Sequence, residues 1–151
     1  MSGYFANPEA TGEALTGDGF FRSGDLGFMT GDGRFVYQSR MGDVLRLAGF
    51  LVSPAEIEAY LKEHPAVADA QVVGIETGGA PRAVAFVIAK AGICWTETEL
   101  LAHCRQRMAN YKVPVRVLPI GDFPVALSAN GNKIHKASLR AIAEAALQAN
   151  S

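Results

Sequence analysis

Lys133 is the residue whose setting is best suited to chemistry. It lies in the stretch Phe123–Lys136, where Asn130-Gly131-Asn132 is a strong turn signal. The pattern predicts an exposed loop that carries Lys133 just before a closing helix. A lysine there brings a compact positive charge on a flexible stem, which suits it to meet phosphate or carboxylate oxygens as negative charge develops between them. The residues alone leave a second interpretation open, in which Lys133 and Lys136 are a solvated pair beside a turn.

Asp25 and Arg40 could each contact a nucleotide. Asp25 follows Ser23-Gly24 at a predicted strand end, where its carboxylate could accept hydrogen bonds from both hydroxyls of a ribose. An ordinary Gly-Asp turn is the alternative. The guanidinium of Arg40 could pair with a ribose or phosphate oxygen, and an exposed loop arginine is the alternative there. No metal site is predicted, because metal-ligand spacing is absent from the histidines and cysteines, which are His64, His103, His135, Cys94 and Cys104.

The stretch Ser39–Glu58 has the clearest local signals. Two short apolar runs, Val44–Leu47 and Phe50–Val52, are separated by Ala48-Gly49, where glycine can supply the positive φ that a tight turn requires. These runs predict a small hairpin. In Ser53-Pro54-Ala55-Glu56, a helix is predicted to open with serine as the N-cap, proline at the first helical position and glutamate returning the capping bond.

The rest of the chain predicts a small α+β domain. Two strands, Ala70–Ile75 and the apolar run Ala83–Ala89, are expected to pair antiparallel, with Val115–Leu118 as a short third strand. A capping box at Thr96–Glu99 opens a second helix, and a last helix from about residue 137 to 148 should bury one stripe. That stripe consists of Leu139, Ile142, Ala143 and Ala146. The expected fold is therefore a three-stranded sheet flanked by helices.

Residues 1 to 38 have a different character. They are rich in glycine and turn signals, and short apolar runs between the turns predict hairpin strands, including one at Phe20-Phe21. Such a segment is too small to bury both faces of a sheet, so a larger body is expected to cover it.

Composition limits the classes of function. The 151 residues suffice for one domain with a short attached segment, and 49% hydrophobic and 19% charged residues are typical of globular proteins. A net charge of -1 disfavours nucleic-acid binding. The longest apolar run, Ala83–Ala89, is far shorter than the roughly 20 residues of a membrane span, and no leader pattern opens the sequence. We expect a cytoplasmic location.

Three stretches in order carry a resemblance to a known family. Arg40-Met41-Gly42-Asp43, together with Gly49 and Pro54–Glu58, resembles the hinge segment of the AMP-forming adenylating enzymes, which include acyl-CoA synthetases, luciferases and nonribosomal-peptide adenylation domains. Phe21–Gly27 before it and Pro124–Lys136 after it also match. The resemblance implies that residues 40–151 are a C-terminal lid domain with a hinge near residues 40–43. Residues 1–39 would then be the terminal β-strands of the large N-terminal domain.

The resemblance also implies roles for the candidate residues. Lys133 matches the lysine that stabilises the adenylation transition state. This chain has Ser128 and Gly131-Asn132-Lys133 where the commoner form has threonine and a Gly-Lys pair, so Lys136 is the fallback. Asp25 matches the residue that holds the ribose of ATP and of the acyl-adenylate, and Arg40 matches a nucleotide contact.

The hinge and the hairpin acquire roles in the same way. Gly42 stands where relatives usually carry an aspartate or lysine as hinge, and Asp43 follows it. Glycine still permits rotation, without the side-chain contact. In the resembling synthetases, the hairpin of Gly49 and Phe50 swings to the active site after adenylation and lines the channel for the pantetheine arm of coenzyme A (CoA). An ordinary hairpin glycine is the alternative.

By resemblance, the complete enzyme would join a carboxylic acid to ATP, release pyrophosphate and pass the acyl group from AMP to CoA. ATP or AMP with Mg²⁺, and CoA, would serve the full-length enzyme, with none bound tightly to this fragment. The partner would be the missing N-terminal domain, whose phosphate loop and acid pocket are expected upstream of residue 1, so the isolated chain is expected to be inert. Two alternatives remain: an adenylation domain that loads a carrier-protein thiol, or a non-catalytic binding or regulatory module. The uncovered hairpins could also drive dimerisation of the fragment.

Overall fold

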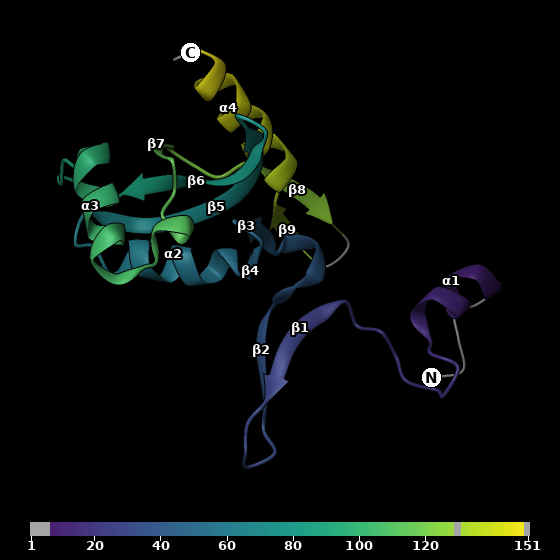
Figure 1. Cartoon of the computed structure of the whole chain (residues 1–151). Helices are drawn as coiled ribbons and strands as arrows, with labels where there is room; N and C mark the ends of the chain where they lie inside the picture. Colours follow the sequence, from purple (N-terminus) through teal and green to yellow (C-terminus); the bar gives the residue numbers. More distant parts are fainter. Residues whose placement is uncertain (1–6, 129–130, 150–151) are drawn as a thin grey trace. The chain divides into compact units, whose positions relative to one another are not determined.

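The chain divides between Asp43 and Val44 into two units in the computed structural model, which describes residues 7–128 and 131–149 (Figure 1). The first unit contains the short helix α1 (Pro8–Ala14) and a hairpin of β1 (Asp25–Met29) and β2 (Phe35–Arg40), followed by the 3-10 turn η1 (Met41–Asp43). The expectation of a hairpin here is confirmed. Aromatic side chains of the hairpin remain exposed, with Phe28 at 49%, Phe35 at 59% and Tyr37 at 57%.

Helix α1 was not expected from the sequence. Asn7-Pro8 is a dipeptide typical of turns, but here the side chain of Asn7 accepts a hydrogen bond from the Ala10 amide, and Pro8 stands in the first turn of the helix. The same residue types that favour turns also begin helices. The predicted strand at Phe20-Phe21 is wrong, because the described backbone there makes only an isolated bridge between Leu15 and Phe21.

The second unit is built on a three-stranded sheet, which confirms the predicted α+β class. Strands β5 (Val67–Thr77) and β6 (Ala80–Ala89) form an antiparallel hairpin, and β7 (Arg116–Pro119) runs parallel to β6 on its other side. Alternate residues of β5 and β6 face opposite sides of the sheet. Both sides are apolar, which explains why the central strand reads as a continuous hydrophobic run.

Helices cover both faces of this sheet (Figure 1). One face packs against α2 (Pro54–Lys62) and α3 (Glu97–Arg107), where Ile57, Leu61 and Leu100 are fully buried. The other face packs against α4 (Lys136–Gln148) through a cluster made of Val73, Ile75, Val84, Phe86, Leu139 and Ala143. The predicted stripe of α4 is only partly correct, because Ile142 is 45% exposed.

Two small hairpins and a 3-10 turn complete the unit. The first pairs β3 (Leu45–Leu47) with β4 (Phe50–Val52), as predicted, and its turn has φ of 49° at Ala48 and 86° at Gly49. The second pairs β8 (Val125–Ser128) with β9 (Gly131–Ile134). The 3-10 turn η2 (Asn110–Lys112) lies between α3 and β7.

The capping predictions have mixed outcomes. The box at Thr96 and Glu99 is present, with both reciprocal bonds. The box at Ser53 and Glu56 is wrong, since α2 begins without a side-chain capping bond and the Glu56 carboxylate instead binds Lys112 at 2.7 Å. Pro54 does open the helix, as predicted.

Each outer strand of the sheet donates a backbone hydrogen bond to a glutamate carboxylate on a helix. Glu58 Oε1 of α2 accepts the Val72 amide of β5 at 3.0 Å, and Glu97 Oε1 of α3 accepts the Val117 amide of β7 at 2.8 Å. These amides lie on the outer strands, where an unpaired N–H would otherwise need water. Of the helices in the described part, none has the length and apolar character that a bilayer crossing requires.

Candidate functional site

Lys133 lies on β9, not in the loop that the sequence predicted. Its backbone pairs with Ala126 of β8, and its side chain is exposed. The next residue, Ile134, packs against the α4 cluster, so strand alternation turns Lys133 outward. Part of the predicted turn, at residues 129–130, lies outside the described residues. Lys136, the fallback candidate, is the first residue of α4 and is half-buried.

Asp25 and Arg40 are brought together across the β1–β2 hairpin. They occupy opposite positions in the register, and Arg40 Nε lies 3.3 Å from Asp25 Oδ1. The Met41 amide donates to the Gly24 carbonyl at 2.8 Å, which closes this end of the hairpin next to η1. Arg40 is 64% exposed and Asp25 30%, so the pair can still meet a ligand. The carboxylate retains lone pairs that could accept ribose hydroxyls.

Gly42 and Asp43 form the last part of η1, where the two units divide. Gly42 does not have a positive φ, and a Cβ placed on it would meet no described atom within 4 Å. The backbone here therefore does not require glycine. A larger side chain would fit the same local conformation.

The tip of the β3–β4 hairpin is exposed and supported from one side. Phe50 is 57% exposed and stacks on Tyr111 of η2, with 4.7 Å between ring centroids and 23° between the planes. The adjacent Lys112 is bound to Glu56 of α2, and this hydrogen bond raises the pKa of Lys112. The turn η2 is thus bound to α2 through Lys112, and its Tyr111 supports the ring of Phe50 next to Gly49.

A hollow of about 600 Å³ adjoins this support. We call it the arginine hollow, and its lining consists of Arg82, Ala83, Arg105, Asn110, Tyr111, Val113, Pro114 and Val115. Its two arginines make no ion pair with the described residues, and no acidic side chain lines it. Tyr111 both lines the hollow and stacks on Phe50, which joins the hollow to the hairpin tip. Sequence reasoning missed this site, because Arg82 and Arg105 lie on separate elements and share no motif.

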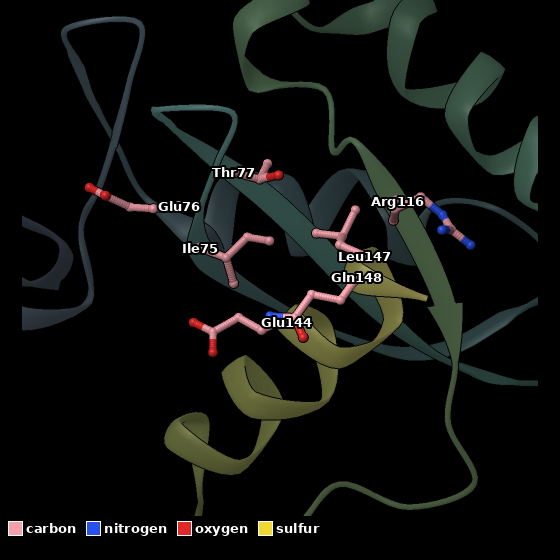
Figure 2. Close-up of a pocket in the computed structure, with 7 residues that line it drawn as sticks. All are labelled: Ile75, Glu76, Thr77, Arg116, Glu144, Leu147 and Gln148. Carbon is pink, nitrogen blue, oxygen red and sulfur yellow. The ribbon is translucent and has the colours of Figure 1, made fainter. Parts of the chain in front are cut away.

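A second hollow, of about 330 Å³, lies between the end of β5 and the last turns of α4 (Figure 2). Glu76 and Glu144 project on one side, whereas the guanidinium of Arg116 points away and binds Glu97 at 2.8 Å. None of the residues predicted to do chemistry lines it. We therefore do not assign it to the site.

Cys104 is buried and is not available as a nucleophile. Burial raises the pKa of Cys104 to about 11, which keeps its thiol neutral near pH 7. Cys94, in contrast, is exposed. Within residues 7–128 and 131–149, no group of three or more His, Cys, Asp or Glu side chains could hold a metal ion.

Comparisons with known proteins match this geometry to adenylating enzymes. The family model described as "AMP-binding enzyme C-terminal domain" matches residues 56–131. Over 115 residues the chain is 44% identical to probable 4-coumarate–CoA ligase 2 of Dictyostelium discoideum, covering 74% of this chain and 20% of that protein. Over 125 residues it is 42% identical to 2-succinylbenzoate–CoA ligase of Geobacillus kaustophilus, covering 81% and 25%. The chain thus spans a quarter or less of the length of these relatives.

Solved structures give the same result. ATP-bound MatB from Rhodopseudomonas palustris superposes with a TM-score of 0.82 at 29% identity, over 93% of this chain and 27% of that one. O-succinylbenzoate coenzyme A synthetase (MenE) from Bacillus subtilis, in complex with AMP, superposes with a TM-score of 0.79 at 29% identity, over 93% and 28%. Each of these matches covers residues from both units of the chain.

Proposed function

The chain belongs to the family of AMP-binding enzyme C-terminal domains, and from that premise we propose that it is the C-terminal part of an AMP-forming acid–CoA ligase. The complete enzyme first lets a substrate carboxylate attack the α-phosphate of ATP, which forms the acyl-adenylate and releases pyrophosphate. The thiol of CoA then attacks the acyl carbonyl, and AMP leaves. The names of the relatives support this pair of reactions. Since ATP and CoA are cytoplasmic metabolites, we propose a cytoplasmic location.

The exposed Lys133 is the observation that carries this proposal. Ile134 is anchored in the α4 cluster while Lys133 faces outward, so the strand presents a cation without burying it. In the first reaction, this ammonium would stabilise the charge that develops between carboxylate and α-phosphate. Asp25 and Arg40, already paired, would hold the ribose and a nucleotide oxygen. Magnesium would accompany the phosphates of ATP, and we assign it no ligand among the described residues.

We propose that residues 40–43 are the hinge between the two reactions. The division of the chain after Asp43 supports this, and so does the open space around Gly42. Rotation of the second unit about this hinge would withdraw Lys133 from the nucleotide after the first reaction. It would bring the tip of the β3–β4 hairpin there for the second reaction. Gly49, with its positive φ and open surroundings, would let the pantetheine arm of CoA pass close to the backbone beside Phe50.

The arginine hollow favours CoA over a carrier protein as the acceptor. CoA carries a phosphorylated nucleotide, whereas a carrier protein presents the pantetheine arm on its own surface without that nucleotide. Two arginines without ion-pair partners among the described residues, beside the hairpin tip, suit phosphate oxygens.

Replacing Arg105 with glutamine is expected to raise the KM for CoA about tenfold or more, because a hydrogen bond to a charged group contributes about 1.5–3 kcal/mol. Steady-state thioester formation by the ligase that carries this chain measures it. Arg107→Gln is the matched control, since Arg107 lies on the same helix but pairs with Glu63 at the surface. An unchanged KM for CoA, together with efficient loading of a carrier protein, would favour the carrier-protein alternative.

The proposed function is tested by assaying the chain alone and as part of a chimeric ligase. The 151-residue chain alone is expected to release no pyrophosphate from ATP with any acid. Exchanged for the matching segment of the Geobacillus 2-succinylbenzoate–CoA ligase, it should support pyrophosphate release and thioester formation. Release by the isolated chain would contradict the need for an N-terminal domain, and a folded but inactive chimera would contradict the assignment.

We also propose that the isolated chain forms a dimer through its exposed Phe28, Phe35 and Tyr37. Light scattering on the isolated chain measures this.

A further inference from the structure

The β3–β4 hairpin is firmly attached at its base. Leu45, Leu47 and Val52 are buried in the core cluster that also contains residues of α2 and α3. Gly74 of β5 makes room for this attachment, because a Cβ placed on it would lie 2.8 Å from Cδ2 of Leu45. The base of the hairpin therefore belongs to the same core as the sheet.

The tip of the hairpin has much less support of its own. Each strand contributes only three residues, and a short two-stranded hairpin is marginally stable in water. Ala48 has a φ of 49°, a left-handed conformation that is unfavourable for a residue with a Cβ. Phe50, directly after the turn, is exposed, so burial within the hairpin does not offset this cost. The conformation of the turn at residues 48–49 therefore depends on a contact from outside the hairpin.

Tyr111 of η2 supplies that contact. Its ring stacks on the ring of Phe50, with 4.7 Å between the centroids and 23° between the planes. Ring pairs at such distances attract each other beyond the area that they bury. Tyr111 is itself half-buried and packs against the core cluster. One side chain thus connects the exposed tip of the hairpin to the core of the second unit.

The backbone that carries Tyr111 is attached on both sides. Lys112 Nζ donates to Glu56 Oε1 of α2 at 2.7 Å, and the lysine side chain is mostly buried, so water screens this pair less than an exposed one. The Val115 amide donates to the Ala83 carbonyl of β6 at 2.9 Å. The turn η2 is therefore fixed between α2 and the sheet, and the ring of Tyr111 has a defined position.

We propose that Tyr111 is a positioning residue for thioester formation: through the ring of Phe50, it holds the turn at residues 48–49 in the conformation that the pantetheine arm of CoA passes. The contacts stand independently of any activity, and only their use in catalysis rests on the proposed function. A misplacement of about 1 Å can lower a rate about 100-fold, so a turn that samples other conformations would slow the attack of the thiol. The first reaction uses Lys133 instead and should not depend on Tyr111.

NMR relaxation of the full 151-residue chain tests the positioning without any assay of activity. In the parent, the amides of Ala48 and Gly49 should have order parameters of about 0.85, as in rigid strands. In Tyr111→Leu, which keeps an apolar side chain but loses the ring, they should fall below about 0.6. Tyr111→Phe keeps the ring and should preserve the order of the turn.

Phe50→Leu removes the other ring of the pair at an exposed position, so it tests the same contact without disturbing the core. It should loosen the turn as Tyr111→Leu does. Order parameters that stay near about 0.85 in either variant would overturn the proposal.

Glu56→Gln should also reduce the order of the turn, by a smaller amount, because it removes the charge that holds Lys112. Glu63→Gln is the matched control. Glu63 follows the last residue of α2 and pairs with Arg107 of α3, not with η2. Equal effects of the two glutamine variants would contradict a role for η2 in supporting the tip.

In the active ligase, Tyr111→Leu should lower kcat for thioester formation from a supplied acyl-adenylate about tenfold. Exchange between pyrophosphate and ATP, which reports the first reaction, should change less than about twofold. Tyr111→Phe should recover most of the lost rate. The double variant Tyr111→Leu/Phe50→Leu should lose no more than either single variant, since both break the same contact.

Two kinetic results would contradict the proposal. Because Tyr111 also lines the arginine hollow, a rise in the KM for CoA with kcat unchanged would assign it to ligand binding there, not to positioning. An equal loss in both reactions would indicate a general structural role. A ligase that makes no thioester even with the parent chain would refute the proposed function, and the NMR result would still decide whether Tyr111 holds the turn.

Discussion

Replacing Lys133 with alanine is expected to lower the rate of acyl-adenylate formation about 100- to 1,000-fold, as for other groups that stabilise charge mainly in a transition state. The ammonium would meet the carboxylate and the α-phosphate only as they join, so kcat should fall far more than the KM for ATP changes. Isotope exchange between pyrophosphate and ATP, in the ligase that carries this chain, measures this step alone.

Three comparisons make the result specific. Lys90→Ala, at an exposed position after β6, should change the rate less than twofold, within the usual range for a surface substitution of about 0.5 kcal/mol. Thioester formation from a supplied acyl-adenylate should survive Lys133→Ala. A large loss in Lys136→Ala together with a neutral Lys133→Ala would move the catalytic assignment to Lys136. Two neutral variants would favour the non-catalytic module.

Phe86→Ala is expected to lower the free energy of unfolding of the second unit by about 3–5 kcal/mol. Phe86 is 1% exposed in the middle of β6, and its ring is part of the cluster that attaches α4 to the sheet. Truncation would leave a cavity between two layers that are already closely packed. Since domains commonly have only about 5–15 kcal/mol of stability, a large part of it would be lost. Urea unfolding followed by circular dichroism measures the change.

Ile142→Ala is the matched control. This side chain is on α4 too, but it is 45% exposed, and alanine is the better helix former. Its effect should stay within about 1 kcal/mol. Similar losses in both variants would show that α4 is held by more than the buried cluster described here.

The sequence predicted those parts of the fold whose signals are local. Strand periodicity located β5 and β6, the glycine turn located the β3–β4 hairpin, and Thr96 and Glu99 located the start of α3. Local signals were misleading where the same residue types occur in two kinds of secondary structure. Asn7-Pro8 opens α1 although it is also a turn pattern, and the stretch around Lys133 extends into a strand although it is rich in turn residues.

The sequence nominated the candidate residues one by one, but it did not predict how they are arranged. Asp25 and Arg40 were singled out separately, and their ion pair depends on the register of β1 and β2, which no single position encodes. The arginine hollow joins β6, α3 and η2, elements whose packing is decided by burial elsewhere. Nothing in the spacing of Arg82 and Arg105 signals that they line the same cavity.

The two carboxylates that end the sheet also limit how this domain can associate. With the Val72 and Val117 amides already engaged by Glu58 and Glu97, neither outer strand offers a free ladder for an incoming peptide at these positions. At these two positions, a partner must therefore be recognised through side chains and shape, not by extending the backbone pairing. Such contacts can be made and released repeatedly without disturbing the strands themselves.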